Sequence, residues 1–217
     1  ELLIYLVVLD CNRIMERSLI LVGGGGHCKS VIEAAESAGY TIKGILDISS
    51  RVGEKVLDYT IIGTDDDIFL YTEDCDFIVT LGFIKDASLR IHLHDKIEKA
   101  GGHLATVIAS TAHISRYAKL GEGTVVLHQA CINAGARVGK GCIINTFANI
   151  EHDTVIGDYC HISTGVMVNG DCKVGKNSFI GSHSVLINGI AICDKVIISA
   201  DSFIRKNILK AGVYINN

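Results

Sequence analysis

Two histidines in the second half of the sequence stand where acid–base chemistry could take place. His152 is followed directly by Asp153, and His161 comes nine residues later. A neighbouring carboxylate can orient an imidazole ring and raise its basicity, which suits a general base. We therefore predict that His152 removes a proton from a substrate with support from Asp153. Because most surface histidines do no chemistry, the hypothesis depends on a scaffold that brings other groups to the same place.

A second candidate site lies near the start of the sequence. Four glycines, Gly23 to Gly26, separate an apolar strand-like segment at 18–22 from a helix-like segment that begins at His27. Backbone N–H groups at a helix start, unobstructed by side chains, can bind a phosphate. A glycine turn needed only for tight packing, with His27 as a plain helix-start residue, remains the alternative.

Asp47 extends this candidate site. It stands about 20 residues after the glycines, at the end of a second apolar segment, where it could hold a ribose hydroxyl. Cys28 replaces the last glycine of a full dinucleotide fingerprint, and only about 90 residues are available for this half. A mononucleotide or a nucleotide sugar therefore fits better than NAD.

The order of elements in the first half favours a parallel α/β sheet of the Rossmann-like kind. Strand-like and helix-like segments alternate along the chain. We expect strands at 18–22, 42–46 and 77–81, and helices at 27–38, 65–73 and 86–100.

The second half repeats with a period of six residues. Stepping by six from Ile108 to Ile204 meets Ile, Leu or Val at all seventeen positions. The residue two places earlier is mostly small, as at Ala130, Cys142 and Ser178. Residues two apart on a strand point to the same side, so both positions point inward and the residue between them, such as His161, points outward.

Glycines at 121, 139, 157 and 175 show that three such steps make one larger repeat of 18 residues. Three short strands per turn build a triangular parallel β-helix that rises about 4.8 Å per turn. The flat faces of such a solenoid favour side-by-side packing. We therefore expect a closed homotrimer with a site at the subunit seam.

Composition excludes several other classes of protein. The net charge of −4, from 20 Lys and Arg against 24 Asp and Glu, argues against a nucleic-acid partner. The eight cysteines form no C-x-x-C pair, so we expect reduced thiols in a cytoplasmic protein, without disulfides or a zinc site. No apolar run is long enough to predict membrane insertion.

These patterns divide the chain into three parts. Residues 1–14 are interpreted as a probable extension ahead of Met15, with an added edge strand as the alternative. The α/β domain is expected over 15–103 and the β-helix over 104–217.

The hexapeptide steps, the stretch NTFANIEHDTVIGDYCHISTGV and the stretch GGGGHCKSV together resemble the sugar O- and N-acetyltransferases. That family includes sialic acid O-acetyltransferases and bacillosamine or perosamine N-acetyltransferases. The resemblance extends over about residues 15–215 and departs at Thr164, where the family often has proline. It implies a left-handed β-helix, acetyl-CoA as the acetyl donor, a homotrimer with active sites between neighbouring β-helices, and no metal.

The resemblance also implies roles for single residues. His152 matches the general base, Asp153 matches the acid that raises its basicity, and His161 matches the residue that contacts the thioester carbonyl of acetyl-CoA. The acceptor would attack the thioester directly, without an acyl-enzyme. The remaining matches are Asn145 for the acceptor site, Ser182 and Ala200 for the pantetheine arm, and Gly25, Gly26, His27 and Asp47 for the nucleotide-sugar pocket.

We therefore predict acetyl transfer to the amine of a nucleotide-linked amino sugar in surface-glycan biosynthesis, with O-acetylation of sialic acid or another sugar as the alternative. Two other functions fit the scaffold less well. A metalloenzyme like the trimeric β-helix carbonic anhydrases needs two histidines five apart, whereas His152 and His161 are nine apart. A non-catalytic platform would have no use for the intact His152–Asp153 pair.

Overall fold

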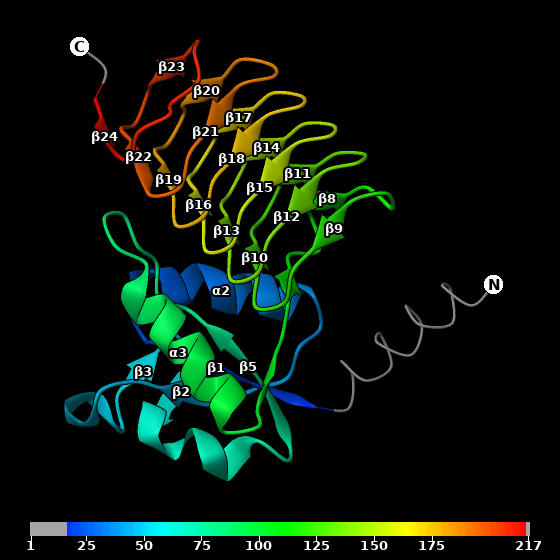
Figure 1. Cartoon of the computed structure of the whole chain (residues 1–217). Helices are drawn as coiled ribbons and strands as arrows, with labels where there is room; N and C mark the ends of the chain where they lie inside the picture. The colour runs from blue at the N-terminus through cyan, green and yellow to red at the C-terminus, as the bar shows by residue number, and fades with distance from the viewer. Residues whose placement is uncertain (1–16, 216–217) are drawn as a thin grey trace. The chain divides into compact units, whose positions relative to one another are not determined.

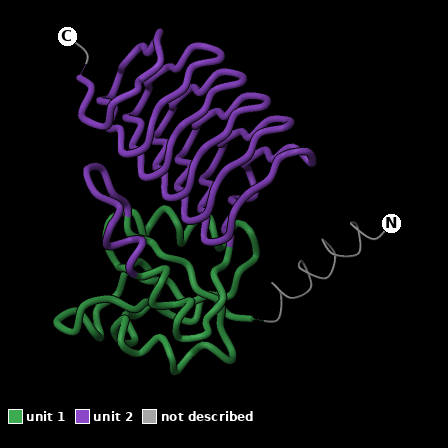
Figure 2. Tube along the Cα trace, in the orientation of Figure 1, with its two compact units in different colours: residues 1–81, 93–105 green, residues 82–92, 106–217 purple. Residues whose placement is uncertain are grey.

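The computed structural model describes residues 17–215, so the predicted extension at 1–14 lies outside the described residues. The chain divides into two compact units (Figure 1, Figure 2). The first unit comprises the described residues up to Leu81 together with 93–105. The second unit comprises 82–92 and the described residues from Thr106 onward, so the loop at 82–92 belongs with the β-helix.

The first unit is built on a six-stranded sheet in the order β3-β4-β2-β1-β5-β6. Its centre is apolar on both faces, which is why its strands appear as continuous apolar runs. The elements predicted from the sequence are present, and β1, β2, β5 and β6 pair in parallel. They are β1 (Ser18–Val22), α2 (Gly26–Ser37), β2 (Ile42–Leu46), β5 (Cys75–Val79) and α3 (Ser88–Lys99), whereas the edge strand β6 (His103–Leu104) was not predicted.

The opposite edge of this sheet was not predicted either. A hairpin of β3 (Lys55–Val56) and β4 (Tyr59–Gly63) is antiparallel, and β4 pairs in parallel with β2. β3 has only two residues, and β4 has two buried residues among its five, so the hairpin carries little hydrophobic signal. A 3-10 helix, η1 (Ser49–Arg51), precedes the hairpin. A second one, η2 (Asp65–Tyr71), follows it where the sequence predicted an ordinary helix at 65–73.

The second unit is a left-handed parallel β-helix, as predicted. Its strands are mostly two residues long, and in β7 to β23 each ends on one of the predicted aliphatic positions. They form three parallel sheets, which we call face 1, face 2 and face 3. Face 1 contains β7 (Val107–Ile108), β10 (Val125–Val126), β13 (Ile143–Ile144), β16 (His161–Ile162), β19 (Phe179–Ile180), β22 (Val196–Ile198) and β24 (Gly212–Tyr214). Face 2 contains β8 (His113–Ile114), β11 (Cys131–Ile132), β14 (Asn149–Ile150), β17 (Met167–Val168), β20 (Val185–Leu186) and β23 (Phe203–Ile204). Face 3 contains β9 (Lys119–Leu120), β12 (Arg137–Val138), β15 (Val155–Ile156), β18 (Lys173–Val174) and β21 (Ala191–Ile192).

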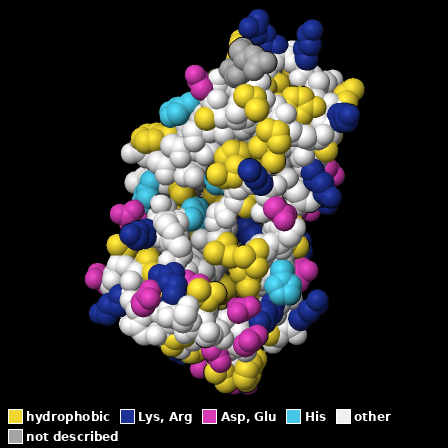
Figure 3. Space-filling model, turned by 90° about the vertical axis from the view of Figure 1, so that its left-hand side faces the viewer, with side chains coloured by type: hydrophobic (Ala, Val, Ile, Leu, Met, Phe, Trp, Pro, Cys, Tyr) yellow, Lys and Arg dark blue, Asp and Glu magenta, His cyan; other side chains and the backbone are white. Residues whose placement is uncertain are grey.

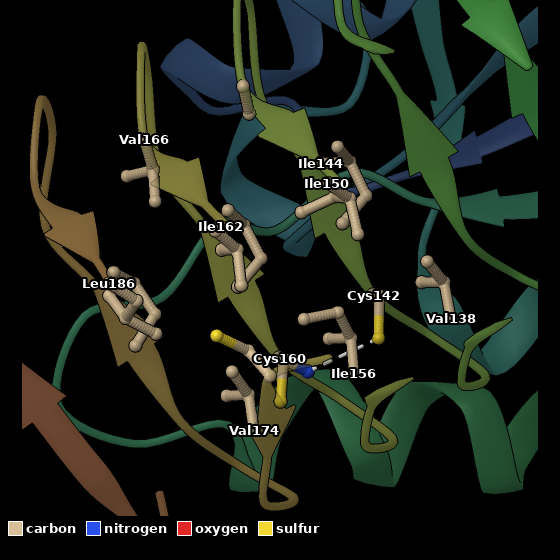
Figure 4. Close-up of a cluster of buried hydrophobic side chains, with 14 of the residues drawn as sticks. Val138, Cys142, Ile144, Ile150, Ile156, Cys160, Ile162, Val166, Val174 and Leu186 are labelled. Carbon is tan, nitrogen blue, oxygen red and sulfur yellow. Dashed lines mark hydrogen bonds between the residues drawn. The ribbon is translucent and has the colours of Figure 1, made fainter. Parts of the chain in front are cut away.

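The aliphatic positions fill the interior of the β-helix (Figure 4). Those in the middle turns are buried, and the four partly buried ones belong to the outer turns: Ile108, Ile114, Leu120 and Ile204. The small residues two places earlier are also inside and bond to the backbone. Cys142 and Cys160, for example, donate their thiol hydrogens to Gly157 O and Gly175 O, both at 3.1 Å. These cysteines therefore serve as small interior residues.

The corners of the β-helix repeat a left-handed backbone conformation every six residues. From Gly123 to Asp201 it falls three places before each aliphatic position and is taken by glycine, as at Gly135 and Gly165, or by residues such as Asp153 (φ 60°) and His183 (φ 59°). Asp and Asn tolerate this conformation better than most residues, which explains turns made without proline. Because Asp153 occupies such a corner, the backbone fixes the place of the His152–Asp153 pair.

Two negative findings apply to residues 17–215. All seven cysteines in this part of the chain are free thiols. No helix within it has the length and apolar character needed to cross a membrane.

Candidate active site

His152 and Asp153 form a hydrogen-bonded pair at the corner between face 2 and face 3. The ring donates its Nδ1 hydrogen to Asp153 Oδ2 at 2.9 Å, and the two side chains are 60% and 68% exposed. The hydrogen bond to Asp153 raises the pKa of His152 above its usual value, and desolvation opposes this rise. The negative charges of Asp153, Glu151 and Asp171 add to the rise. With Nδ1 committed to Asp153, the free lone pair of a neutral ring is on Nε2. The structure therefore brings this predicted pair together in a form suited to a general base.

Gly170 supports the His152 ring and was missed in the sequence. A Cβ atom added at Gly170 would lie 2.6 Å from His152 Nε2 and 2.7 Å from Cε1. Gly170 stands 18 residues after His152, one full turn of the β-helix later, so the ring lies against the neighbouring turn. The 18-residue repeat is the signal that could have found it.

His161 lies on face 1, in β16, and is only 8% exposed. Its side chain leaves the interior, as predicted, but the loop at 82–92 covers it. The Phe83 ring packs edge-on against the His161 ring, with 5.7 Å between the ring centroids, and the Phe179 ring packs edge-on against it with 5.1 Å between centroids. The sequence could not indicate this cover because Phe83 is 78 residues away.

The buried His161 ring is hydrogen-bonded on both sides. Nδ1 lies 2.8 Å from Phe83 O, and Nε2 lies 3.3 Å from Asn145 Nδ2. Desolvation by burial lowers the pKa of His161 to about 4, and the positive charge of Arg90 acts in the same direction, whereas the Phe83 hydrogen bond opposes it. His161 is therefore neutral at physiological pH.

Arg90 anchors the covering loop and was also missed in the sequence. Its side chain is 1% exposed. Nε donates to Gly141 O at 2.8 Å, and Nη2 donates to Gly123 O at 3.3 Å, at a corner of the β-helix beside face 1. Burial lowers the pKa of Arg90 to about 10, so the guanidinium stays charged at neutral pH. Arg90 lies in the first turn of α3, and a single arginine on a helix gives no sequence signal for such a contact.

The corner between face 1 and face 2 brings together three predicted residues. Asn145 and Ser182 are half-buried there, and Ala200 is exposed. Ser182 Oγ lies 2.9 Å from Ser163 Oγ, which links two turns of the β-helix. In a single chain, face 2 therefore separates this corner from the one that carries His152.

In the first unit, the glycine turn leaves an open helix start. Gly25 is the N-cap of α2, and Gly26 is its first residue. Both are exposed, and a Cβ atom added to either would meet nothing within 4 Å. His27 follows in the first turn, which contains no acidic side chain. An anion can therefore approach these N–H groups.

Asp47 ties this turn to the end of β2. Its Oδ2 accepts from Gly24 N at 2.9 Å and pairs with Arg51 Nη1 at 2.6 Å, while its Oδ1 accepts from Ile48 N at 2.8 Å. The carboxylate thus holds the glycine turn in place. Its contact with a ribose hydroxyl stays a prediction, as do the ligand contacts of the other predicted site residues.

A metal centre finds no support in the part of the chain that the structure describes. Within residues 17–215, no group of three or more His, Cys, Asp or Glu side chains is placed to hold a metal ion. Histidine side chains also reach the surface on the side drawn in Figure 3, where they do not form such a group.

Comparisons with known proteins identify the parts of the chain. The PglD N-terminal domain model matches residues 18–97, the bacterial transferase hexapeptide model matches 135–170, and the model for the hexapeptide repeat of succinyl-transferase matches 172–217. No curated protein matches the chain significantly.

Among the solved structures that match nearly the whole chain are two that contain CoA or acetyl coenzyme A. One is a mutant of perosamine N-acetyltransferase from Caulobacter crescentus in complex with CoA and GDP-perosamine, with 29% identity, a TM-score of 0.86, and coverage of 92% of this chain and 93% of that chain. The other is the acetyltransferase domain of PglB from Neisseria gonorrhoeae FA1090 in complex with acetyl coenzyme A, with 27% identity, a TM-score of 0.85, and coverage of 93% and 97%. The fold and the family resemblance predicted from the sequence are thereby confirmed.

Replacing Gly170 with Ala should disturb the His152 ring without disturbing the fold. The backbone of Gly170 lies outside the left-handed region, so alanine fits the chain, but its Cβ would lie 2.6 Å from Nε2 and must displace the ring. We expect kcat of the transfer reaction proposed below to fall about 10–100-fold through misplacement of the base, with the melting temperature unchanged. Steady-state kinetics and thermal unfolding check this, and a wild-type kcat would contradict it.

Replacing Asp153 with Asn should move the pH profile in a defined direction. The hydrogen bond to the Asp153 carboxylate raises the pKa of His152. The neutral amide of asparagine can accept only a weaker hydrogen bond from Nδ1, so that pKa should fall. A base acts in its neutral form, so the acidic limb of kcat/KM should move to lower pH while the plateau falls because the base is weaker. Asp171→Asn is the matched control, since Asp171 also lies at a left-handed corner but acts on His152 only through its charge. An equal shift in both variants would argue against the role of the hydrogen bond.

Proposed function

Because the chain belongs to the hexapeptide-repeat sugar acetyltransferases, we propose that it transfers an acetyl group from acetyl-CoA to the amine of a nucleotide-linked amino sugar. The observation that carries this proposal is the His152–Asp153 pair, which leaves Nε2 as an exposed base. The amine is favoured over a hydroxyl because the perosamine enzyme is an N-acetyltransferase. Seven free thiols suit a cytoplasmic location.

The reaction needs one base and one site for developing negative charge. His152 Nε2 takes a proton from the acceptor amine as its nitrogen attacks the thioester carbonyl carbon. The new C–N bond forms, the carbonyl oxygen becomes an oxyanion, and the C–S bond then breaks. The proton returns to the departing thiolate, giving CoA and the acetylated sugar. No acyl-enzyme is required.

We place acetyl-CoA along the corner between face 1 and face 2. Ser182 and Ala200 provide small side chains there, so a thin pantetheine arm can lie against successive turns, and Asn145 at the same corner stays assigned to the acceptor side of the site. The two solved relatives contain CoA or acetyl coenzyme A, which supports this class of ligand.

We assign the nucleotide part of the acceptor to the first unit. The exposed N–H groups of Gly25 and Gly26 open α2 and suit a diphosphate. His27 follows this turn directly in the sequence, and Asp47 contacts the turn through Gly24 N. The GDP-perosamine bound to the Caulobacter relative supports a nucleotide sugar as the acceptor class.

The proposed site becomes complete in a trimer in which face 2 of each subunit lies toward the threefold axis. The outward residues of face 2 include Cys131, Met167, Val185 and Phe203, whereas face 3 presents Lys119, Arg137 and Lys173. An uncharged flat face suits subunit contacts better than a row of like charges. The two corners beside face 2 then meet across each seam, so that His152 of one copy faces the Ser182 corner of its neighbour.

The His152→Ala variant tests the reaction. The side chain is 60% exposed and contributes nothing to the interior, so stability should change by less than about 1 kcal/mol. Loss of the base should lower kcat by roughly 10²–10⁴-fold. Release of free CoA thiol from acetyl-CoA with a panel of nucleotide amino sugars measures this, and a folded variant with full activity would remove the assignment.

Mixing two inactive variants tests the seam. His152→Ala lacks the base, and Ser182→Trp blocks the opposite corner, so each alone should be inactive. In each trimer that contains both chains, one of the three seams joins two intact corners. In a random equal mixture this is about a quarter of all seams, and activity should return to that extent. Separately purified proteins that are not allowed to exchange subunits serve as the control. A mixed preparation without activity would place the site within one chain.

A further inference from the structure

Three hydrogen bonds at the corner between face 1 and face 2 determine which atoms of Asn145 and His161 carry hydrogen. Thr146 N–H donates to Asn145 Oδ1 at 2.8 Å, and only an oxygen can accept there, so the orientation of the amide is fixed. The Asn145 Nδ2 group then faces His161 Nε2 at 3.3 Å. An amide nitrogen donates, so Nε2 is the acceptor and carries no proton.

The hydrogen bond at Nδ1 of His161 leads to the same protonation state of the ring. His161 Nδ1 lies 2.8 Å from the Phe83 carbonyl oxygen, which can only accept. The single proton of the neutral ring is therefore on Nδ1. Arg90 is the charged group near the ring, and its positive charge also opposes a second proton.

We propose that His161 is a positioning residue that holds the Asn145 amide through its Nε2 lone pair, and that the second hydrogen of Asn145 Nδ2 is donated to the carbonyl oxygen of the bound thioester. This inference rests on the function proposed above. It differs from a direct donation by His161, because an unprotonated Nε2 would face the carbonyl oxygen with a lone pair.

The exposure of the two residues supports this division of roles. His161 is 8% exposed under the Phe83 loop, whereas Asn145 is half-buried at the corner that also carries Ser182. Two of the three polar functions of the Asn145 amide are engaged by Thr146 and His161, which leaves one N–H in a fixed direction. A donor already oriented in this way gains strength as negative charge develops on the oxygen, without reorganisation.

Nitrogen NMR of the full-length protein with labelled histidine tests the proton positions without any substrate. We expect His161 to show a protonated Nδ1 and an unprotonated Nε2, unchanged between pH 8 and about pH 5. A proton on Nε2 within that range would overturn the proposal. Because this measurement needs no acetyl transfer, it stands even if the proposed function fails, and an absence of transfer in the wild-type protein would count against the function alone.

Two substitutions at His161 distinguish the contribution of its Nε2 hydrogen bond to Asn145 from that of its Nδ1 hydrogen bond to Phe83. In His161→Gln, the side-chain oxygen can take the place of Nε2 and accept from Asn145. In His161→Asn, the shorter amide can keep the bond to Phe83 O but cannot reach Asn145. We expect His161→Gln to keep kcat within about fivefold, and His161→Asn to lose about 10²-fold, with little change in KM.

Asn145→Ala completes the test, since it removes the proposed donor from a half-buried position. It should lower kcat about 10²–10³-fold, and adding His161→Asn should cause little further loss, because His161 acts through Asn145. Thermal unfolding confirms that each variant is folded. Equal losses in His161→Gln and His161→Asn, or near-normal kcat in Asn145→Ala, would overturn the proposal.

Discussion

The inward column of aliphatic side chains is the constraint on which the second unit depends. Each two-residue strand buries one of them, and the strand below and the strand above pair with it in parallel, 18 residues away on either side. A slip of one residue would place the outward residue inside, so the register is fixed by burial of apolar surface. All functional positions on the β-helix inherit their place from this register. His152 lies against Gly170, and Asn145 reaches His161, because turns stack at a fixed interval.

The corners of the β-helix place polar side chains at regular intervals on its surface. A left-handed residue is required every six positions, and where it is not glycine it can be a polar residue with a functional side chain, as at Asp153. Because the two corners beside face 2 cannot approach each other within one chain, a threefold assembly gives a simple reason for their separation. In the trimer that we propose, each copy provides the proposed base at one seam and the proposed acetyl-CoA corner at the other.

The sequence predicted the regular parts of the molecule and missed the contacts between distant segments. The period of six gave the β-helix and its inward residues, and the apolar runs gave β1, β2 and β5. The β3–β4 hairpin was missed because β3 has only two residues and β4 is largely half-buried, so neither strand forms the apolar run seen in the central strands. The cover over His161 was missed for another reason: Phe83 and Arg90 lie far away in the chain, and single residues do not show which distant carbonyl or ring they will contact.

The two histidines singled out in the sequence illustrate how environment assigns chemistry to one residue type. His152 is exposed and bonded to a carboxylate, which raises its pKa and favours proton uptake. His161 is enclosed by two phenylalanine rings near a buried arginine, which lowers its pKa to about 4 and keeps it neutral. Titratable groups whose pKa values are pushed apart take different roles. The exposed ring can exchange a proton during turnover, whereas the buried one offers a fixed lone pair. In a reaction that moves one proton and creates one oxyanion, the first property suits the base, and the second suits a group that keeps a neutral donor in position.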